Sequence, residues 1–404
     1  MRVKIKPGTA RGVISAPPSK SMAHRLLISA AMAEGVSRVM GISGCEDVRA
    51  TLDCLHALGV KTEEAGDTVT VYGKSPLKYE PTDTLKCRES GSTLRFMIPA
   101  VMLSGRTAMM VGAESLMSRP MDVYKKIADE RGLDFITDKT SITVRGPLTA
   151  GEFSVVGNVS SQFISGLLFA LPALHDDSRI KIAPPIESRS YIEMTIAALS
   201  TFGVSVVWED EHTLFIKGGQ SYKACDVTVE GDYSGAAFPE ALNLFGGEVR
   251  VEGLSESTLQ GDSVYKKYYE MLVRGVPTIH IGDCPDLGPI LFAVAAAKCG
   301  GIFSGTKRLK IKESDRASAM ASELEKFGVS VNVYEDKVVV YPADFHAPGS
   351  ILFGHGDHRI VMSLAVLLTL TGGEIEGAEA VRKSYPAFFD HLRALGIEVT
   401  EYDA

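Results

Sequence analysis

Residues 17–25 (Pro-Pro-Ser-Lys-Ser-Met-Ala-His-Arg) place two cations and two hydroxyls at the start of an apolar segment. The prolines disfavour helix before them and Ser19 is a good N-cap, so a helix is predicted to begin near Lys20. The residues after Arg25 are almost all apolar, which predicts that the helix is buried. Its N-terminal N–H groups, with Ser21 and both cations, would bind phosphate or carboxylate; an ordinary capped helix with solvated side chains is the alternative.

Two further stretches have anion-binding character. Gly91 lies among small residues in segment 89–95, Glu-Ser-Gly-Ser-Thr-Leu-Arg, where backbone N–H groups can approach an anion closely. The segment is not a Walker A loop, because no Gly-Lys-Ser/Thr follows. Arg119 stands at the predicted start of an outer helix, where it would extend a positive site or lie at the surface.

Hydroxyl and amide groups open the next predicted helices. Ser160, Ser161 and Gln162 precede a strongly apolar segment, and Ser188 and Tyr191 lie at the start of another helix. These groups suit hydrogen bonds to a hydroxylated or phosphorylated ligand. A nucleophilic serine is not indicated at Ser160 or Ser161, because no Gly-x-Ser-x-Gly motif surrounds them, and plain helix capping is the alternative for Ser188.

Candidate acid–base groups are concentrated in the C-terminal half. Asp286 stands at the start of a predicted buried helix, and Lys312, Glu313 and Arg316 fall within one turn of another. A lysine, a glutamate and an arginine so close together can combine anion binding with proton transfer. A helix cap at Asp286 and a solvated helix start are the alternatives.

A charged segment, Gly-Asp-His-Arg at 356–359, leads directly into a wholly apolar helix. Because buried charges need partners, Arg359 is predicted to belong to a polar site. Lys383 completes the set of candidate cations. A metal site at His355 and His358 is disfavoured, because no third histidine or cysteine cluster lies nearby.

These groups recur in step with an internal repeat. A helical segment that ends in glycine and an aliphatic residue occurs six times, with the glycines at Gly59, Gly132, Gly203, Gly275, Gly328 and Gly396. Glycine at such a point predicts a left-handed helix C-cap. A second series, of predicted buried helices, begins at Lys20, Gly91, Ser160, Ser234, Asp286 and Asp357. Both series shorten between their fourth and fifth members, so we expect six copies of one unit.

Each unit is predicted to hold a buried helix, a strand, an amphipathic outer helix and one or two further strands. The clearest further strands are 69–72, 141–145, 213–217 and 337–341. Six units divide naturally into two domains of three. We place them at 17–231 and at 1–16 together with 232–404, so that the N-terminal strand joins the C-terminal half.

The composition is that of an ordinary globular protein, with 404 residues, 45% of them hydrophobic and 23% charged. The net charge of −8 argues against nucleic-acid binding, and no apolar segment is long enough to suggest a membrane partner. Six scattered cysteines without a CxxC pair favour a reduced, cytoplasmic setting and disfavour a zinc site. Parallel buried helices with their N-termini at one end would still form an anion trap.

The motifs resemble those of the 5-enolpyruvylshikimate-3-phosphate (EPSP) synthases, in order and over essentially the whole chain. They are Ser19-Lys20-Ser21 with Arg25, Ser160-Ser161-Gln162, Lys312-Glu313-Ser314-Asp315-Arg316, Asp357-His358-Arg359 and Lys383. The resemblance implies an α/β fold, a two-domain inside-out α/β barrel in which each domain has three βαβαββ units with buried parallel helices. It also implies transfer of the carboxyvinyl (enolpyruvyl) group of phosphoenolpyruvate to the 5-hydroxyl of shikimate 3-phosphate, with release of phosphate, in the shikimate pathway of aromatic amino-acid biosynthesis.

The same resemblance assigns the candidates. Shikimate 3-phosphate is expected to contact Ser21, Arg25, Ser160, Ser161, Gln162, Ser188, Tyr191, Asp286 and Lys312. Phosphoenolpyruvate is expected to contact Lys20, Gly91, Arg119, Gln162, Arg316, Arg359 and Lys383. The expected catalytic residues are Lys20, Asp286 and Glu313. Domain 17–231 would bind shikimate 3-phosphate and the other would supply carboxylates and cations; no metal or cofactor is implied, and a monomer is expected.

The implied chemistry is addition followed by elimination. The 5-hydroxyl, deprotonated by Asp286 or Lys20, attacks C2 of phosphoenolpyruvate while Glu313 protonates C3. The tetrahedral ketal then loses a C3 proton and phosphate. The cations fit this reaction because they let two anionic substrates share one site.

Some positions depart from the family pattern. Glu89 and Ser92 stand where the family often has asparagine and threonine, Phe96 replaces a frequent proline, and Arg308 falls near a family asparagine. Glu89 is expected to turn to a cation or to solvent, because a carboxylate beside an anionic substrate is repelled.

Two other functions fit part of the same pattern. The related enolpyruvyl transferase that acts on UDP-N-acetylglucosamine usually carries a reactive cysteine before the arginine matched by Arg119, and segment 114–118 has none. A non-catalytic phospho-ligand binding protein would keep the cations but would not need Asp286 and Glu313 together.

Overall fold

The computed structural model describes residues 1–82 and 84–402. The chain forms two compact units: Lys20–Glu230, called here the N-terminal unit, and Met1–Ser19 with Gly231–Ala404, called the C-terminal unit. Each unit has its own hydrophobic core, so each is described by itself.

Three sheets of four strands make up the outside of the N-terminal unit, as far as it is described. Their strand orders are β14-β3-β5-β4, β6-β7-β9-β8 and β10-β11-β13-β12. The bounds are β3 Gly35–Met40, β4 Lys61–Ala65, β5 Thr68–Gly73, β6 Leu85–Arg88, β7 Thr107–Gly112, β8 Asp134–Thr137, β9 Ser141–Arg145, β10 Glu152–Val156, β11 Ser178–Ala183, β12 Val206–Trp208, β13 Thr213–Ile216 and β14 Val227–Thr228. In each sheet the first two strands are parallel and the remaining pairs are antiparallel.

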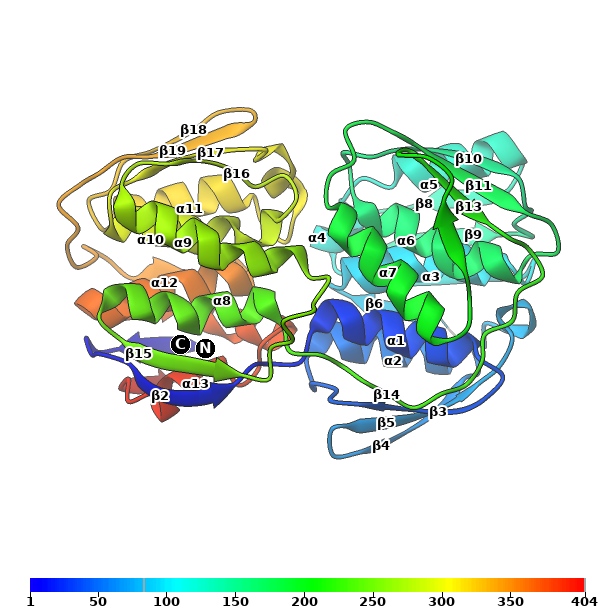
Figure 1. The fold of residues 1–404 in the computed structure, drawn as a ribbon, viewed down its shortest axis with the longest axis horizontal. Coiled ribbons are helices and arrows are strands. Elements are labelled where there is room, and N and C mark those ends of the chain that lie inside the picture. Colours follow the sequence, from blue (N-terminus) through cyan, green and yellow to red (C-terminus); the bar gives the residue numbers. More distant parts are fainter. Residues whose placement is uncertain (83, 403–404) are drawn as a thin grey trace. The chain divides into compact units, whose positions relative to one another are not determined.

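Three buried helices fill the middle of this unit: α1 (Lys20–Met32), α3 (Gly91–Met102) and α6 (Ser161–Ala170). Figure 1 shows them stacked with the sheets around them. Their sequences are apolar on nearly every side, which is the pattern of a helix enclosed by other elements. Helices with one apolar face lie beside them: α2 (Glu46–Ala57), α5 (Asp122–Arg131) and α7 (Arg189–Thr201); short turns add η1 (Pro76–Lys78), α4 (Glu114–Met117) and η2 (Leu171–Ala173).

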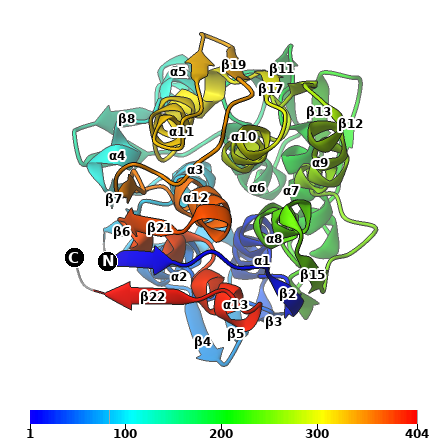
Figure 2. The ribbon, with the colours of Figure 1, turned by 90° about the vertical axis from the view of Figure 1, so that its left-hand side faces the viewer.

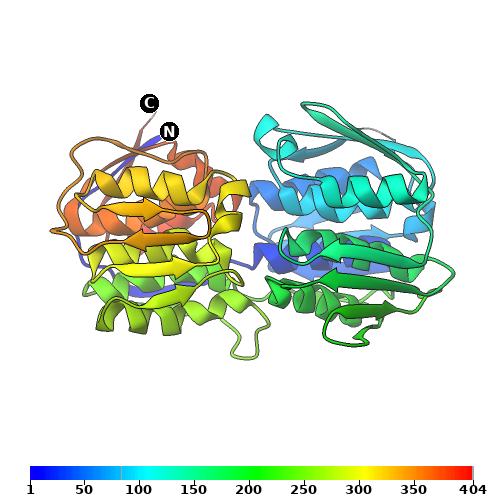
Figure 3. The ribbon, with the colours of Figure 1, turned by 90° about the horizontal axis from the view of Figure 1, so that it is seen from above.

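The C-terminal unit repeats this plan with two complete sheets and one reduced sheet among its described residues. Their orders are β16-β17-β19-β18, β20-β21-β1-β22 and β15-β2. The bounds are β1 Arg2–Ile5, β2 Arg11–Ser15, β15 Glu248–Glu252, β16 Thr278–His280, β17 Gly301–Ser304, β18 Val331–Val333, β19 Lys337–Val340, β20 Leu352–Phe353, β21 Gly373–Glu376 and β22 Val399–Tyr402. The yellow and orange strands β16–β19 lie side by side on one face in Figure 3.

The N-terminal residues thus supply β1 to one sheet and β2 to another in the C-terminal unit. The buried helices here are α8 (Tyr233–Ala241), α10 (Gly288–Ala297) and α12 (His358–Thr371), seen end-on near the middle of Figure 2. The remaining helices are α9 (Tyr265–Arg274), α11 (Arg316–Glu325), α13 (Phe388–Ala394) and the 3-10 turns η3 (Leu242–Phe245), η4 (Gly261–Val264), η5 (Pro285–Leu287), η6 (Lys307–Ile311) and η7 (Ala378–Lys383).

One of the six predicted units is incomplete. After α9 the chain runs directly into β16, which is the first strand of the next sheet, so the outer hairpin found in the other units is missing between Arg274 and Thr278. This explains why both sequence series shorten between their fourth and fifth members. The expectation of one or two further strands in every unit is wrong for this one.

The glycine caps follow the same division. Gly59, Gly132, Gly203, Gly328 and Gly396 have φ values of 73°, 64°, 78°, 81° and 87°, the left-handed conformation that the repeat predicted. Gly275 has φ 163° and ψ −152°, which is extended backbone, so the predicted C-cap there is wrong. The physical reason is that α9 is followed by a link to another sheet instead of a returning hairpin. No described helix is long and apolar enough to cross a membrane.

Candidate active site

The N-terminus of α1 carries the first predicted cation. The helix begins at Lys20, as predicted, and Lys20 Nζ donates to Asp47 Oδ2 of α2 at 2.8 Å. Both side chains are largely buried, at 15% and 12% exposure. An ion pair with so little solvent around it is screened weakly, so Lys20 is held in one place at the helix end. The sequence did not identify Asp47 as its partner.

Arg25 lies one turn deeper and is buried at 2% exposure. Its Nε donates to Thr195 Oγ1 at 2.8 Å, its Nη1 to the Ser21 carbonyl at 2.6 Å and its Nη2 to the Tyr191 carbonyl at 3.0 Å. Burial lowers the pKa of Arg25 to about 10, which still leaves the guanidinium charged at neutral pH. Arg25 therefore joins α1 to α7, and it brings Ser21 and Tyr191 together as predicted.

Gly91 lies where guanidinium groups converge. A Cβ added there would lie 3.0 Å from Arg119 Nη1, 3.1 Å from Arg95 Nη1 and 3.7 Å from Gln162 Oε1. Ser90 caps α3 by accepting from Thr93 N at 3.2 Å, so the first N–H groups of the helix are at the same place. The three predicted residues Gly91, Arg119 and Gln162 are thus brought together.

Gln162 connects the two helices at this point. Its Oε1 accepts from Arg95 Nη1 at 2.7 Å and its Nε2 donates to Ser92 Oγ at 2.9 Å. Arg95 was part of the motif in the sequence but was not singled out. Its side chain is buried at 6% exposure and stacks on Phe163 at 5.1 Å, so it adds a fixed positive charge beside Gly91.

The serines of this unit differ in their roles. Ser160 caps α6 by accepting from Gln162 N at 3.3 Å, and Ser161 is buried. Ser188 precedes α7 in a left-handed conformation with φ 58°, and its side chain does not cap the helix. Simple capping therefore explains Ser160 but not Ser188. A non-glycine residue held at positive φ is strained, and such strain is concentrated at functional sites.

Asp286 is the centre of the second group of predicted residues, in the C-terminal unit. It lies in η5, a 3-10 turn of three residues that precedes α10. The N-cap position of α10 is Leu287, so the alternative that Asp286 is the N-cap is wrong. Its Oδ1 is 2.7 Å from Arg316 Nη1 and 3.1 Å from Lys312 Nζ, and its Oδ2 is 3.2 Å from Arg359 Nη2. One carboxylate thus faces three cations.

Arg316 in turn contacts three carboxylates. It pairs with Asp286, with Glu313 Oε2 at 2.6 Å and with Asp357 Oδ2 at 2.8 Å. Burial lowers the pKa of Arg316, but Asp357, Glu313 and Asp286 together raise it above its usual value. The guanidinium is therefore permanently charged and holds Glu313 in a fixed position.

The remaining predicted cations also lie in this unit. Arg359 Nη1 donates to Ser234 Oγ at 2.8 Å and to the Asp286 carbonyl at 3.0 Å. Lys383, at the end of η7, donates from Nζ to the Gly356 carbonyl at 2.6 Å. Burial lowers the pKa of Lys312, and the nearby Asp286 opposes that shift.

The departures from the family pattern have local environments of their own. Glu89 is half-buried, between exposed Arg88 and buried Ser90. Phe96 lies in the core, 5.2 Å from the Arg25 guanidinium. Arg308 is buried and donates from Nη1 to the Gly282 carbonyl at 3.1 Å.

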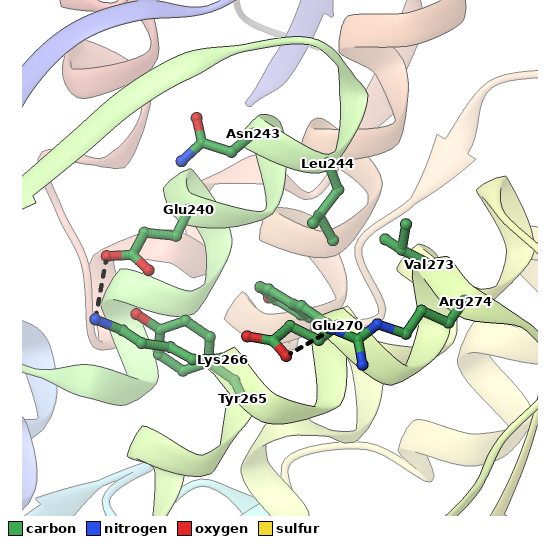
Figure 4. A pocket seen from close by; sticks show the side chains of 9 residues that line it. Glu240, Asn243, Leu244, Tyr265, Lys266, Glu270, Val273 and Arg274 are labelled. Atoms are coloured by element: carbon green, nitrogen blue, oxygen red, sulfur yellow. Dashed lines mark hydrogen bonds and ion pairs between the residues drawn. The ribbon is translucent and has the colours of Figure 1, made fainter.

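A metal site and a separate pocket are two further features to consider. In residues 1–82 and 84–402, no group of three or more histidine, cysteine or acidic side chains is placed to hold a metal ion. A groove of about 420 Å³ lies between the end of α8, η3 and α9, away from the predicted residues (Figure 4). Glu240 of α8 pairs with Lys266 of α9, and Glu270 pairs with Arg274 on α9 itself. The charged side chains that line the groove therefore neutralise one another.

Comparison with known proteins identifies the family of this chain. The family model of EPSP synthase (3-phosphoshikimate 1-carboxyvinyltransferase) matches residues 5–392. The chain belongs to the EPSP synthase family. The resemblance inferred from the sequence motifs is therefore confirmed, and the chain is an enzyme of this family.

Curated relatives of the family align with almost the whole chain. A 3-phosphoshikimate 1-carboxyvinyltransferase of Clostridium botulinum (strain Alaska E43 / Type E3) is 37% identical over 430 residues, covering 99% of this chain and 98% of that protein. One from Clostridium kluyveri is 37% identical over 421 residues, with 99% and 98% covered. 

Solved structures carry the same fold. EPSP synthase from Acinetobacter baumannii has a TM-score of 0.77 and 24% identity, with 99% of this chain and 100% of that chain covered. The predicted α/β fold class is thereby confirmed.

Proposed function

We propose that this chain transfers the carboxyvinyl group of phosphoenolpyruvate to the 5-hydroxyl of shikimate 3-phosphate and releases phosphate. The observation that carries the proposal is the ionic cluster around Arg316, in which Asp286 and Glu313 lie among Lys312 and Arg359. A site that only bound phosphorylated ligands would gain nothing from two carboxylates there, because they repel the ligand. Carboxylates held in place by cations are what proton transfer requires.

The N-terminal unit is assigned the binding of shikimate 3-phosphate. Ser21, Arg25, Ser160, Ser161, Gln162, Ser188 and Tyr191 supply its contacts, with Asp286 and Lys312 from the C-terminal unit. The support is Arg25, whose guanidinium is anchored to Thr195, Ser21 and Tyr191 and therefore loses little side-chain entropy on binding an anion.

Phosphoenolpyruvate is assigned to the cations and to one glycine. Lys20, Gly91, Arg119 and Gln162 in the N-terminal unit and Arg316, Arg359 and Lys383 in the C-terminal unit hold it. The support in the N-terminal unit is the convergence of Arg119, Arg95 and Gln162 on Gly91, where only a residue without a side chain leaves room for an anion.

The reaction follows from these assignments. Asp286 or Lys20 takes the proton of the 5-hydroxyl, and the oxygen attacks C2 of phosphoenolpyruvate. Glu313 gives a proton to C3, forming a tetrahedral ketal. Removal of a C3 proton and departure of phosphate then restore the double bond. The cations stabilise the charge that develops on the phosphate and carboxylate groups during both steps.

Release of phosphate by the purified protein tests the proposal. Release should require shikimate 3-phosphate and phosphoenolpyruvate together, and neither alone should suffice. No release from folded protein would contradict it, and release with UDP-N-acetylglucosamine in place of shikimate 3-phosphate would indicate the related transferase.

The setting of the enzyme is part of the same proposal. We place it in the cytoplasm, where its six cysteines, all present as thiols, would stay reduced. We expect it to act as a monomer; sedimentation velocity at working concentrations would test that state.

A further inference from the structure

A buried chain of hydrogen bonds connects three helices of the N-terminal unit. His24 Nδ1 lies 2.8 Å from Thr51 Oγ1, and Thr51 Oγ1 lies 2.8 Å from Thr93 Oγ1. Thr93 Oγ1 donates to Ser90 Oγ at 2.7 Å. All four side chains are 0% exposed, and none of them has a role in the chemistry described so far. They belong to α1, α2, α3 and the cap of α3.

The direction of this chain is fixed by counting protons. Thr93 has one hydroxyl proton, and it goes to an acceptor other than Thr51: to Ser90 Oγ at 2.7 Å, with the Asp47 carbonyl as a more distant acceptor at 3.4 Å. Thr51 must therefore donate to Thr93, and His24 must donate to Thr51 from Nδ1. The imidazole then carries a proton on Nδ1.

The other ring nitrogen agrees with this tautomer. His24 Nε2 is buried without a hydrogen-bond partner among the described residues, and the ring meets Phe96 edge-on at 6.5 Å. A bare acceptor at that place costs less than an N–H group left without an acceptor. Burial, together with Lys20 and Arg25, lowers the pKa of His24 well below 6.5, so the ring stays neutral.

The His24–Thr51 hydrogen bond is the deeper of two connections between α1 and α2. Lys20 pairs with Asp47, and one helical turn further along both helices His24 bonds Thr51. Both connections end on Thr93, through the Asp47 carbonyl and through Thr51. Thr93 also donates its backbone N–H to Ser90, the residue before Gly91.

We propose that His24 and Thr51 are positioning residues for phosphoenolpyruvate: through Thr93 and Ser90 they fix Gly91 at the start of α3 relative to Lys20 at the start of α1. The inference rests on the assignment of Lys20 and Gly91 to phosphoenolpyruvate in the proposed function. His24 and Thr51 touch neither substrate. Their effect is to keep the two anion-binding helix ends at one separation.

Two substitutions of Thr51 separate the hydrogen bonds from packing. Thr51→Val keeps the shape and removes the hydroxyl, whereas Thr51→Ser keeps the hydroxyl and removes a methyl group. In phosphate-release assays, Thr51→Val should raise KM for phosphoenolpyruvate by roughly fivefold or more, with KM for shikimate 3-phosphate changed less than about twofold. Thr51→Ser should stay within about twofold of wild type for both substrates.

Ser29→Ala is the matched control, because Ser29 is equally buried on α1 and its hydroxyl has no hydrogen-bond partner in the described residues. It should change neither KM. Equal loss in Thr51→Val and Thr51→Ser, or an equal rise of both KM values in Thr51→Val, would overturn the inference.

Gly91→Ala and Arg119→Gln test the assignment of phosphoenolpyruvate to the Gly91 site separately from the positioning role of His24 and Thr51. If these variants raise KM for phosphoenolpyruvate and Thr51→Val does not, the positioning role is wrong. If they leave it unchanged, the assignment of the site is wrong instead.

A direct measurement keeps the proposal testable if Thr51→Val does not fold. ¹⁵N NMR of the wild-type enzyme with labelled histidine should show His24 protonated on Nδ1 and bare on Nε2 at neutral pH. A proton on Nε2 of His24, whether or not Nδ1 is also protonated, would contradict the proposed series of hydrogen bonds from His24 to Ser90. His24→Asn, which can keep a donor at the Nδ1 position, should preserve KM for phosphoenolpyruvate better than His24→Leu does.

Discussion

Arg316 Nε donates to Asp357 Oδ2 at 2.8 Å, and the two side chains are 1% and 0% exposed. The bond joins the first residue of α11 to the cap of α12, since Asp357 Oδ1 also accepts from Arg359 N at 2.9 Å. The same arginine holds Asp286 and Glu313. The position of the proposed catalytic carboxylates therefore depends on a pair buried in the core.

Asp357→Asn should destabilise the fold strongly. The substitution removes the only one of Arg316's three carboxylate partners that is 0% exposed, while Asp286 and Glu313 still compensate part of the charge. Breaking a buried pair outright costs about 3–5 kcal/mol, so the loss here should be about 2–3 kcal/mol. Urea denaturation would measure the free energy of unfolding. Asp315→Asn is the control: Asp315 caps α11 by accepting from Ser318 N but is more exposed, and asparagine caps a helix about as well as aspartate, so the change should cost less than about 0.5 kcal/mol. Equal losses would contradict the argument.

Thr195→Val should weaken binding of shikimate 3-phosphate. It removes the hydroxyl that accepts from Arg25 Nε at 2.8 Å and leaves a buried charged donor unsatisfied. A hydrogen bond to a charged group is worth about 1.5–3 kcal/mol, so KM for shikimate 3-phosphate should rise on the order of tenfold. Thr195→Ser should keep most of the affinity. A rise confined to KM for phosphoenolpyruvate would show that Arg25 is wrongly assigned.

Gly91→Ala should weaken binding of phosphoenolpyruvate. The added Cβ would lie 3.0 Å from Arg119 Nη1 and 3.1 Å from Arg95 Nη1, so one of these cations must move. The guanidinium tips can give way by a few tenths of an ångström, so the fold should tolerate the change, but the methyl group takes space proposed for the anion and displaces its cations. A loss of about 1.4 kcal/mol of binding free energy would raise KM for phosphoenolpyruvate roughly tenfold. Gly349→Ala is the control, because a Cβ there meets nothing within 4 Å. An unchanged KM in Gly91→Ala would contradict the prediction.

The pH dependence of stability should contain a contribution from His24. Its pKa is well below 6.5 in the folded state because burial, Lys20 and Arg25 disfavour the charged ring, whereas the unfolded chain binds a proton near pH 6.5. The stabilisation is therefore complete above pH 6.5 and falls by about 1.4 kcal/mol per pH unit below it. Urea denaturation at several pH values between 5 and 7 gives the free energy of unfolding, and its change with pH should be smaller for His24→Asn than for the wild-type protein. An identical slope would contradict a neutral, buried His24.

Much of the fold could be predicted from the sequence, because each repeat is marked by local patterns such as a glycine cap and an alternating strand. Five of the six glycine caps, including Gly59 and Gly132, have the left-handed φ that was expected, and Ser141–Arg145 forms the strand predicted there. Gly275 failed because glycine followed by an aliphatic residue also occurs where a helix leads to an extended link. The missing hairpin depended on which sheet β16 would join, and local pattern does not determine strand pairing.

The site divides in the same way. Helix ends and charged motifs identified Lys20, Arg25, Arg316 and Arg359, whose types and positions carry their own signal. The partners Asp47 and Thr195 were missed, because a carboxylate or hydroxyl inside an amphipathic helix resembles a surface residue until the neighbouring helix is placed. Arg95 was in the Gly91 motif but was not singled out, because its bond to Gln162 joins two helices 67 residues apart in sequence. Long-range pairing, with Thr195 170 residues from Arg25, has no local trace in the sequence.

Asp286→Asn tests the step that separates an enzyme from a binding protein. Asp286 faces Lys312, Arg316 and Arg359, so the carboxylate offsets positive charge that would otherwise attract the anionic substrates. Removing its charge should lower kcat by about 10²–10⁴-fold, the usual range for loss of a general base, while both substrates bind as well as or better than before. Isothermal titration and phosphate release would measure the two effects on one preparation. Asp390→Asn, which neutralises an exposed carboxylate paired with Arg393 elsewhere in this unit, should change neither. Weaker substrate binding in Asp286→Asn, with kcat unchanged, would mean that the carboxylate only organises the cations and that proton transfer belongs to another group.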